Sequence, residues 1–152
     1  MSERDGLRDL LFRLPPARAA AAKFIAGETH AEALRAAAEL NREGFRVTLD
    51  LLGESVTDRR EAEAAADEYA RSLDLIASSD ATATISLKLT QLGLDIDTGF
   101  CGANLERIVG HAASLGNFVR IDMEGSAYTE RTLAIFYEVF ERHRNVGVVI
   151  QS

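Results

Sequence analysis

Four short segments alternate apolar and polar side chains, which is the pattern of a β-strand with one buried face. Successive strand residues point to opposite faces, so each segment has an apolar side and a polar side. The four segments are Arg46–Leu51, Ile85–Thr90, Phe118–Asp122 and Val148–Gln151. Their polar sides carry Thr48, Asp50, Ser86, Lys88, Arg120, Asp122 and Gln151. We therefore predict four similar strands whose polar side chains converge on one site, with Lys88, Asp122 and Gln151 at its centre.

Amphipathic helices are predicted between these strands, because apolar residues recur there at spacings of three and four. The first opens with a capping-box pattern, Thr29–Glu32, and is expected to end near Arg42, before Gly44. The segment 91–103 is predicted to be a long loop without a recognisable phosphate or metal pattern. The other helices are expected to open at Thr57 and Asp58, at Asn104 and at Thr129.

This alternation of helices and strands indicates parallel strands joined by right-handed crossovers. An open doubly wound sheet is covered on both faces, so its strands need apolar residues on both sides. The polar side of the present strands instead favours a (βα)8 barrel of the TIM type, whose upper layers would line a ligand cavity.

The spacing of the strands predicts about half of such a barrel. The strands are expected to start near residues 46, 83, 118 and 147, and eight units of this length need close to the ~250 residues typical of the fold. We expect residues 1–28 to form an N-terminal helical segment and residues 29–152 a partial barrel domain truncated at a strand. Because this leaves uncovered strand edges, we interpret the chain as a truncated product or a fragment.

Composition narrows the functional classes. The chain of 152 residues has a net charge of −7, which argues against binding to nucleic acid because phosphate contacts require a basic surface. The sequence has no run of the ~18 apolar residues that a transmembrane segment requires, and its N-terminus lacks a secretion-signal pattern. Cys101 is the only cysteine, which fits a reducing compartment. A cytoplasmic protein is expected.

Lys88 is the strongest candidate for a functional residue. An ammonium that points into a barrel must be offset by a carboxylate, such as Asp50 or Asp122, or by an anionic ligand. An internal ion pair without function is the alternative. Asp122 shares a face with Arg120, so a structural salt bridge between them competes with a role in the site. Gln151 offers amide donors and an acceptor to a ligand, but as a single residue it is weak evidence.

Other polar residues carry less weight. Glu124 and Ser126 follow the third strand in a loop, where we expect ordinary solvated side chains. His30, His111 and His143 lack metal-ligand spacing and are expected on helix surfaces. The sequence therefore predicts no metal site.

Five segments of the chain form long strings that mostly coincide with the predicted strands. They are 24–29 (FIAGET), 47–54 (VTLDLLGE), 86–94 (SLKLTQLGL), 117–124 (NFVRIDME) and 146–152 (VGVVIQS). In these segments the chain resembles the proline dehydrogenase family, the flavin enzymes of proline catabolism, and the resemblance runs from about residue 17 to the end.

This resemblance implies a (βα)8 barrel that binds FAD and oxidises L-proline to 1-pyrroline-5-carboxylate, with electrons passing on to a quinone. It implies that Lys88 binds the substrate carboxylate and that Asp122 belongs to the catalytic site. Met123 and Gln151 match positions that contact the flavin. Hydride transfer would then be chiefly the cofactor's chemistry, with the protein supplying orientation and exclusion of water.

Two departures from the family pattern limit this expectation. Gly125 stands where the family usually has an aspartate, and the later strands and C-terminal helix, with their arginine pair, are absent. We therefore expect the chain alone neither to hold FAD tightly nor to turn over proline. One competing hypothesis is a noncatalytic half-barrel that self-associates through its open edges. Another is a barrel enzyme with Lys88 as a Schiff-base nucleophile, and the family resemblance leaves a peripheral membrane location open.

Overall fold

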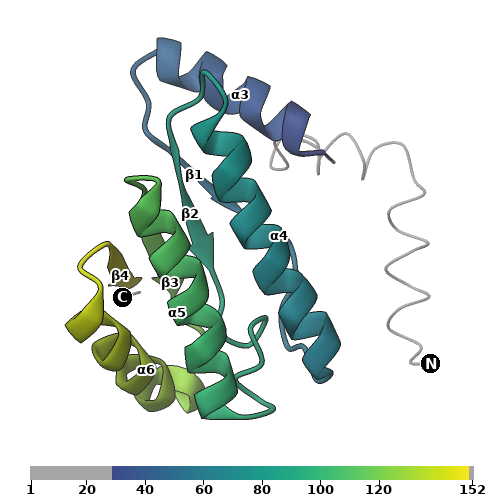
Figure 1. Ribbon diagram of the computed structural model, residues 1–152, viewed down its shortest axis with the longest axis vertical. Helices are drawn as coiled ribbons and strands as arrows, with labels where there is room; N and C mark the ends of the chain where they lie inside the picture. Colours follow the sequence, from purple (N-terminus) through teal and green to yellow (C-terminus); the bar gives the residue numbers. More distant parts are fainter. Residues whose placement is uncertain (1–28, 151–152) are drawn as a thin grey trace.

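The computed structural model describes residues 29–150, and its centre is a parallel sheet of four strands. The strands are β1 (Val47–Asp50), β2 (Ala83–Leu87), β3 (Val119–Asp122) and β4 (Val146–Val149). They lie side by side in chain order (Figure 1). A doubly wound sheet reverses its strand order at a switch point, whereas a barrel wall keeps it. The predicted barrel-type arrangement of parallel strands and helices is therefore confirmed.

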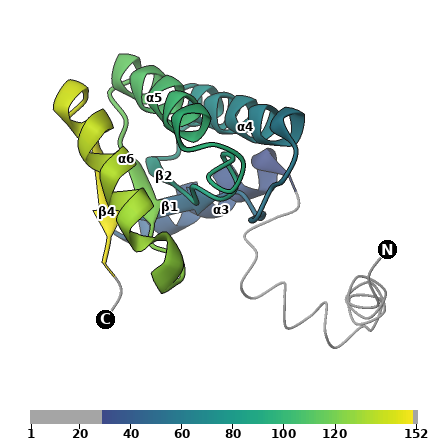
Figure 2. The ribbon, with the colours of Figure 1, turned by 90° about the horizontal axis from the view of Figure 1, so that it is seen from below.

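Four helices and one 3₁₀ turn belong to the described part of the chain. They are α3 (His30–Arg42), α4 (Arg59–Ala77), α5 (Thr98–Ser114), η1 (Ser126–Tyr128) and α6 (Thr129–Arg142). Consecutive helices pack against one another, α3 on α4, α4 on α5 and α5 on α6. Figure 2 shows α4 and α5 lying together along one side of the strands. Within residues 29–150, no helix combines the length and the apolar character needed to cross a membrane.

Two helix starts have the predicted caps. The Thr29 hydroxyl accepts from the amide of Glu32, and the Glu32 carboxylate accepts from the amide of Thr29, which completes the capping box. Asp58 accepts from two backbone amides of the first turn of α4. Gly44 follows α3 with a φ of +90°, a conformation that glycine adopts without strain. Local sequence signals therefore predicted these helix ends correctly.

The predicted start of α5 was wrong. The helix begins at Thr98, and the Asp97 carboxylate accepts from a backbone amide of its first turn at 2.7 Å. Asn104, the predicted cap, lies inside the helix and donates to the carbonyl oxygen of Leu92 at 3.1 Å. The predicted loop 91–103 is therefore a set of turns followed by helix. Two glycines within this part of α5 weaken its local helical signal.

Two further boundaries also differ from the prediction. Thr129 is the first residue of α6 rather than its cap, and Tyr128 occupies the cap position, where its side chain makes no hydrogen bond to the first turn of the helix. The 3₁₀ turn η1 lies directly before α6, so the backbone is already helical when it reaches Thr129. β2 ends at Leu87, before the predicted end at Thr90.

The sheet has one buried face and one open face, as the alternating pattern predicted. Val119 and Ile121 of β3 are fully buried, whereas Arg120 between them is exposed. The buried face joins apolar side chains of α4, α5 and α6 in one core cluster. On the other face, Thr48 and Asp50 of β1 are exposed as well. The helices thus cover the face that a barrel turns outward, and the face that a barrel encloses carries the polar residues.

The turn between β2 and α5 belongs to the core rather than to the surface. Gly93 permits this packing, because its φ is +96° and a Cβ there would lie 2.8 Å from the ring of Phe100. Three leucines of the turn are at most 1% exposed: Leu89, Leu92 and Leu94. The residues that directly follow Lys88 are therefore anchored by packing.

Replacement of Leu105 by alanine should lower the free energy of unfolding by about 2 to 5 kcal/mol, because it leaves a cavity in the core. Leu105 in α5 is fully buried. Leu40 in α3 is the matched control, since it is also helical but 42% exposed, and its replacement should cost less than about 1 kcal/mol. Urea unfolding followed by circular dichroism measures both losses. Equal losses would contradict the described core.

Candidate active site

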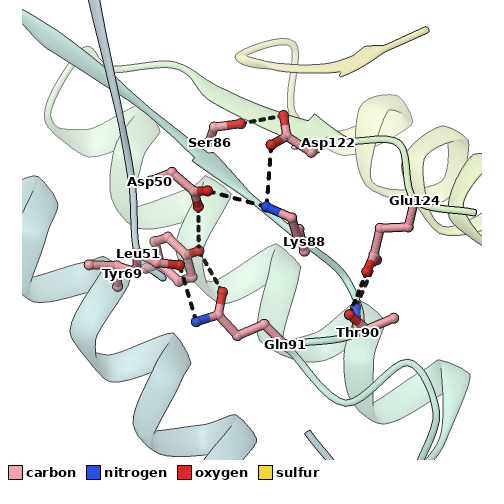
Figure 3. A network of polar contacts seen from close by, with 9 residues as sticks. All are labelled: Asp50, Leu51, Tyr69, Ser86, Lys88, Thr90, Gln91, Asp122 and Glu124. Atoms are coloured by element: carbon pink, nitrogen blue, oxygen red, sulfur yellow. Dashed lines mark hydrogen bonds and ion pairs between the residues drawn. The ribbon is translucent and has the colours of Figure 1, made fainter. Parts of the chain in front are cut away.

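Lys88, Asp50 and Asp122 form a charged cluster at the carboxyl ends of three neighbouring strands (Figure 3). Asp50 and Asp122 are the last residues of β1 and β3, and Lys88 lies one residue beyond β2, between them. Lys88 Nζ lies 3.2 Å from Asp50 Oδ2 and 3.7 Å from Asp122 Oδ2. The predicted pairing of Lys88 with a carboxylate is therefore seen with both candidates.

The ammonium of Lys88 is the charged form at neutral pH. Partial burial lowers its pKa, but the carboxylates of Asp50, Asp122 and Glu124 raise the pKa by more, and the net shift is upward. The Lys88 side chain is 26% exposed, so its ion pairs are partly shielded from solvent. A Schiff-base nucleophile must be a neutral amine. The raised pKa therefore argues against the hypothesis that Lys88 acts as such a nucleophile.

Asp122 is held by β2 rather than by Arg120. The Ser86 hydroxyl donates to Asp122 Oδ1 at 2.5 Å, while Asp122 Oδ2 faces Lys88. Arg120 instead donates to Thr48 Oγ1 at 3.4 Å. Among the described residues, Arg120 and Asp122 do not form the salt bridge that was predicted as the alternative. Ser86 pairs with Arg120 in the register of β2 and β3, so it lies diagonally across from Asp122, a spacing that side chains can bridge.

Tyr69 and Gln91 form a second layer of polar contacts behind Asp50. The Tyr69 hydroxyl donates to Gln91 Oε1 at 2.7 Å and lies 3.4 Å from Asp50 Oδ1. Burial, and then the charge of Asp50, raise the pKa of this phenol, which stays a neutral donor. Gln91 donates to the Leu51 carbonyl oxygen, and its amide nitrogen lies 2.7 Å from where a Cβ on Gly53 would be. Neither Tyr69 nor Gln91 was predicted from the sequence to belong to the site.

Glu124 is not the solvated loop residue that the sequence led us to expect. Its carboxylate accepts from the backbone amide of Thr90 at 3.1 Å and from the Thr90 hydroxyl at 2.5 Å. Thr90 follows Lys88 by two positions, and Glu124 follows Asp122 by two positions. This equal spacing was the signal in the sequence that could have predicted the contact between Thr90 and Glu124. Ser126 is exposed in η1, as expected for a solvated side chain.

Of the two residues that the family resemblance links to the flavin, the structure describes Met123 but not Gln151. Met123 directly follows β3 and is partly buried beside Asp122 in the chain. Gln151 lies outside the described residues, so its predicted convergence with Lys88 stays a prediction. The part of the site that the structure describes is therefore the charged cluster and its supporting layer.

Comparison with known proteins places these features in a family. A family model described as Proline dehydrogenase matches residues 33–152. Proline dehydrogenase 1 of Bacillus subtilis (strain 168) is 34% identical over 135 residues, which cover 89% of this chain and 45% of that protein. Proline dehydrogenase 2 of the same strain is 32% identical over 149 residues, which cover 98% of this chain and 49% of that protein. The chain thus spans about half the length of these curated relatives.

Solved structures support the fold. The crystal structure of proline utilization A from Bdellovibrio bacteriovorus, inactivated by N-propargylglycine, superposes with a TM-score of 0.74. Its sequence identity is 23%, and the match covers 84% of this chain and 16% of that one. Proline utilization A of Bradyrhizobium japonicum, as the mutant D779Y, gives a TM-score of 0.63 at 20% identity. At this identity, the likeness supports the α/β arrangement of the strands and helices.

Replacement of Tyr69 by phenylalanine should lower the free energy of unfolding by about 1 to 3 kcal/mol, because it leaves the buried acceptor Gln91 Oε1 without its donor. Tyr137 is the matched control: it is 61% exposed on α6, and its replacement by phenylalanine should change stability by less than about 0.5 kcal/mol. Chemical unfolding of both variants measures the difference. A Tyr69 variant as stable as the Tyr137 variant would refute a structural role for this hydroxyl.

Cys101 should resist alkylation while the chain is folded. Its thiol is buried and donates to the Leu89 carbonyl oxygen, and burial together with Glu124 raises its pKa to about 12. A raised pKa leaves almost no thiolate at pH 8, and the thiolate is the reactive form. Iodoacetamide labelling, followed by mass spectrometry, should be slow in buffer and fast in guanidinium chloride. Fast labelling of the folded chain would contradict the described burial.

Proposed function

Because this chain belongs to the proline dehydrogenase family, we propose that it supplies the first half of a (βα)8 barrel that oxidises L-proline to 1-pyrroline-5-carboxylate with FAD. The observation that carries the proposal is the ammonium of Lys88, held between Asp50 and Asp122 at the carboxyl ends of parallel strands. Active sites of such barrels form at this end of the strands. The cluster also belongs to the sequence range that the family model matches.

The charges of the cluster suit a zwitterionic amino acid. One ammonium and two carboxylates leave a net charge of −1 on Lys88, Asp50 and Asp122. Lys88 has three N–H donors and donates to Asp50 Oδ2 at 3.2 Å, while Asp122 Oδ2 at 3.7 Å is an ion-pair partner only, so N–H donors remain for the substrate carboxylate. The carboxylate of Asp122 would accept from the secondary ammonium of proline and orient the ring. An anion without a positive group would be repelled by the net charge.

We propose that a flavin binds beside this cluster. An isoalloxazine ring needs apolar surface next to the substrate, and Val149 of β4 pairs in register with Asp122. Met123 is the next residue after Asp122, and Met123 and Gln151 would hold the ring in our proposal. FAD, when bound, supplies the hydride acceptor. The protein's own task is to bind proline through Lys88, orient it through Asp122 and exclude water.

The proposal extends to the electron acceptor and the location. We propose that a quinone reoxidises the flavin and that the protein is cytoplasmic, with peripheral contact to the membrane where a quinone is met. We further propose that the 152 residues alone bind FAD weakly, since the curated relatives that share the family are about twice as long.

A second candidate function is a noncatalytic half-barrel that pairs with another copy of itself. The observation that favours it is the sheet order, because β1 and β4 each have one side without a partner strand among residues 29–150. Open edges of this kind invite pairing between chains. Light scattering distinguishes the candidates: a stable flavin-free dimer favours self-association, and a monomer does not.

A chimera tests the enzymatic proposal. Residues 1–152 would be joined to the part of Bacillus subtilis proline dehydrogenase 1 that lies beyond the matched region. We expect flavin absorbance and proline-dependent reduction of a dye, whereas residues 1–152 alone should show neither. A chimera that is folded but inactive and flavin-free would contradict the enzymatic proposal. Activity of residues 1–152 alone would contradict our claim that they bind FAD weakly.

In the same chimera, Lys88→Met should raise the KM for proline by about tenfold to a hundredfold, since a hydrogen bond to a charged group contributes ~1.5 to 3 kcal/mol. Arg71→Met is the control, because the Arg71 side chain is 71% exposed on α4. Initial rates over a range of proline concentrations give KM for both variants. An unchanged KM in the Lys88 variant would remove Lys88 from the substrate site.

A further inference from the structure

Thr90 connects the three loops that follow β1, β2 and β3. It is fully buried, two residues after Lys88. Its backbone amide and its hydroxyl both donate to the carboxylate of Glu124, in the loop after β3. In the loop after β1, the amide of Ser55 donates to the Thr90 hydroxyl oxygen at 3.1 Å, and the amide of Val56 donates to the Thr90 carbonyl oxygen at 3.1 Å. All four of these hydrogen bonds involve Thr90.

We propose that Thr90 and Glu124 act as positioning residues that hold Lys88 between its two carboxylates. The functional part of this inference rests on the proposed function, because it concerns the residue that would bind the substrate carboxylate. Figure 3 shows the two hydrogen bonds from Thr90 to the Glu124 carboxylate, which together we call the clamp. Neither residue has to touch the substrate for this role.

The end of the backbone ladder explains why such a clamp is needed. The last backbone pair between β2 and β3 is Leu87 with Ile121. Beyond it, side chains join the two strand extensions, first through Lys88 and Asp122 and then through Thr90 and Glu124. A lysine on a long flexible stem keeps many rotamers open. A buried residue that makes two hydrogen bonds to one carboxylate has far less freedom.

Small displacements at this point matter for function. One residue, Leu89, separates Thr90 from Lys88, so a shift of Thr90 moves the backbone of Lys88. Misplacement of a catalytic constellation by about 1 Å can cost on the order of a hundredfold in rate. The chain therefore places a rigid, buried contact directly next to its charged and partly exposed cluster.

The lysine content of the chain allows a direct measurement. Lys88 and Lys23 are the only lysines in the sequence, so Lys23 serves as an internal reference. Competitive acetylation at pH 8 followed by mass spectrometry gives the ratio of Lys88 labelling to Lys23 labelling. Only the neutral amine reacts, so the ratio rises when Lys88 leaves its carboxylates. Neither proline nor flavin is needed, and the result is therefore independent of the proposed function.

Thr90→Val removes the clamp hydroxyl without changing the charge of the chain. We expect the labelling ratio to rise about threefold or more, which corresponds to a fall of roughly half a pKa unit at Lys88. Thr90→Ser keeps the hydroxyl and should return the ratio to the wild-type value. Thr48→Val is the matched control, since its hydroxyl contacts Thr84 and Arg120 outside the clamp.

Two further measurements keep the test decisive. Thermal unfolding of the same samples reports whether each variant changes the stability of the fold. Hydrogen exchange of the Ser55 amide should accelerate in Thr90→Val and not in Thr48→Val. If Thr90→Val destabilises the chain but leaves the labelling ratio unchanged, the clamp stabilises the fold without positioning Lys88. An equal rise in Thr48→Val would show general loosening, and either result overturns the proposal.

Discussion

Lys88 carries a positive charge on the uncovered face of the sheet, and an ammonium that is partly removed from water needs nearby negative charge. The neighbouring strands supply it, because the last residue of β1 and the last residue of β3 are both aspartates. Parallel strands in register present these side chains at one edge. The two ion pairs of Lys88 thus connect the carboxyl ends of three strands. Ser86, Thr90, Glu124, Tyr69 and Gln91 make their hydrogen bonds around these pairs.

The segment that follows Lys88 combines two opposite environments. Its leucines pack into the core, while Thr90 contacts Glu124 in the loop after β3, and Gln91 contacts Leu51 after β1 and Tyr69 of α4. Buried polar groups are favourable only when they are hydrogen-bonded, and both residues meet this requirement. Packing and hydrogen bonding therefore act together on one short turn, next to the residue that is proposed to bind the substrate.

The sequence predicted the fold well where the signals were local or periodic. Alternation located the four strands, and the capping patterns at Thr29 and Asp58 located two helix starts. It failed at α5, where glycines obscured the helical pattern and Asn104 resembled a cap. The family resemblance was also visible in the sequence, and the comparisons with known proline dehydrogenases confirm it.

The sequence by itself determined which residues face the open side of the sheet, because strand alternation is a property of the chain alone. Only the tertiary structure decided which partners these residues choose. Asp122 contacts Ser86 and Lys88 rather than Arg120, and Glu124 contacts Thr90, because the pairing register of β2 and β3 determines which side chains lie within reach of one another. Tyr69 reaches the site for the same reason: a helix residue meets a strand end only after the chain has folded.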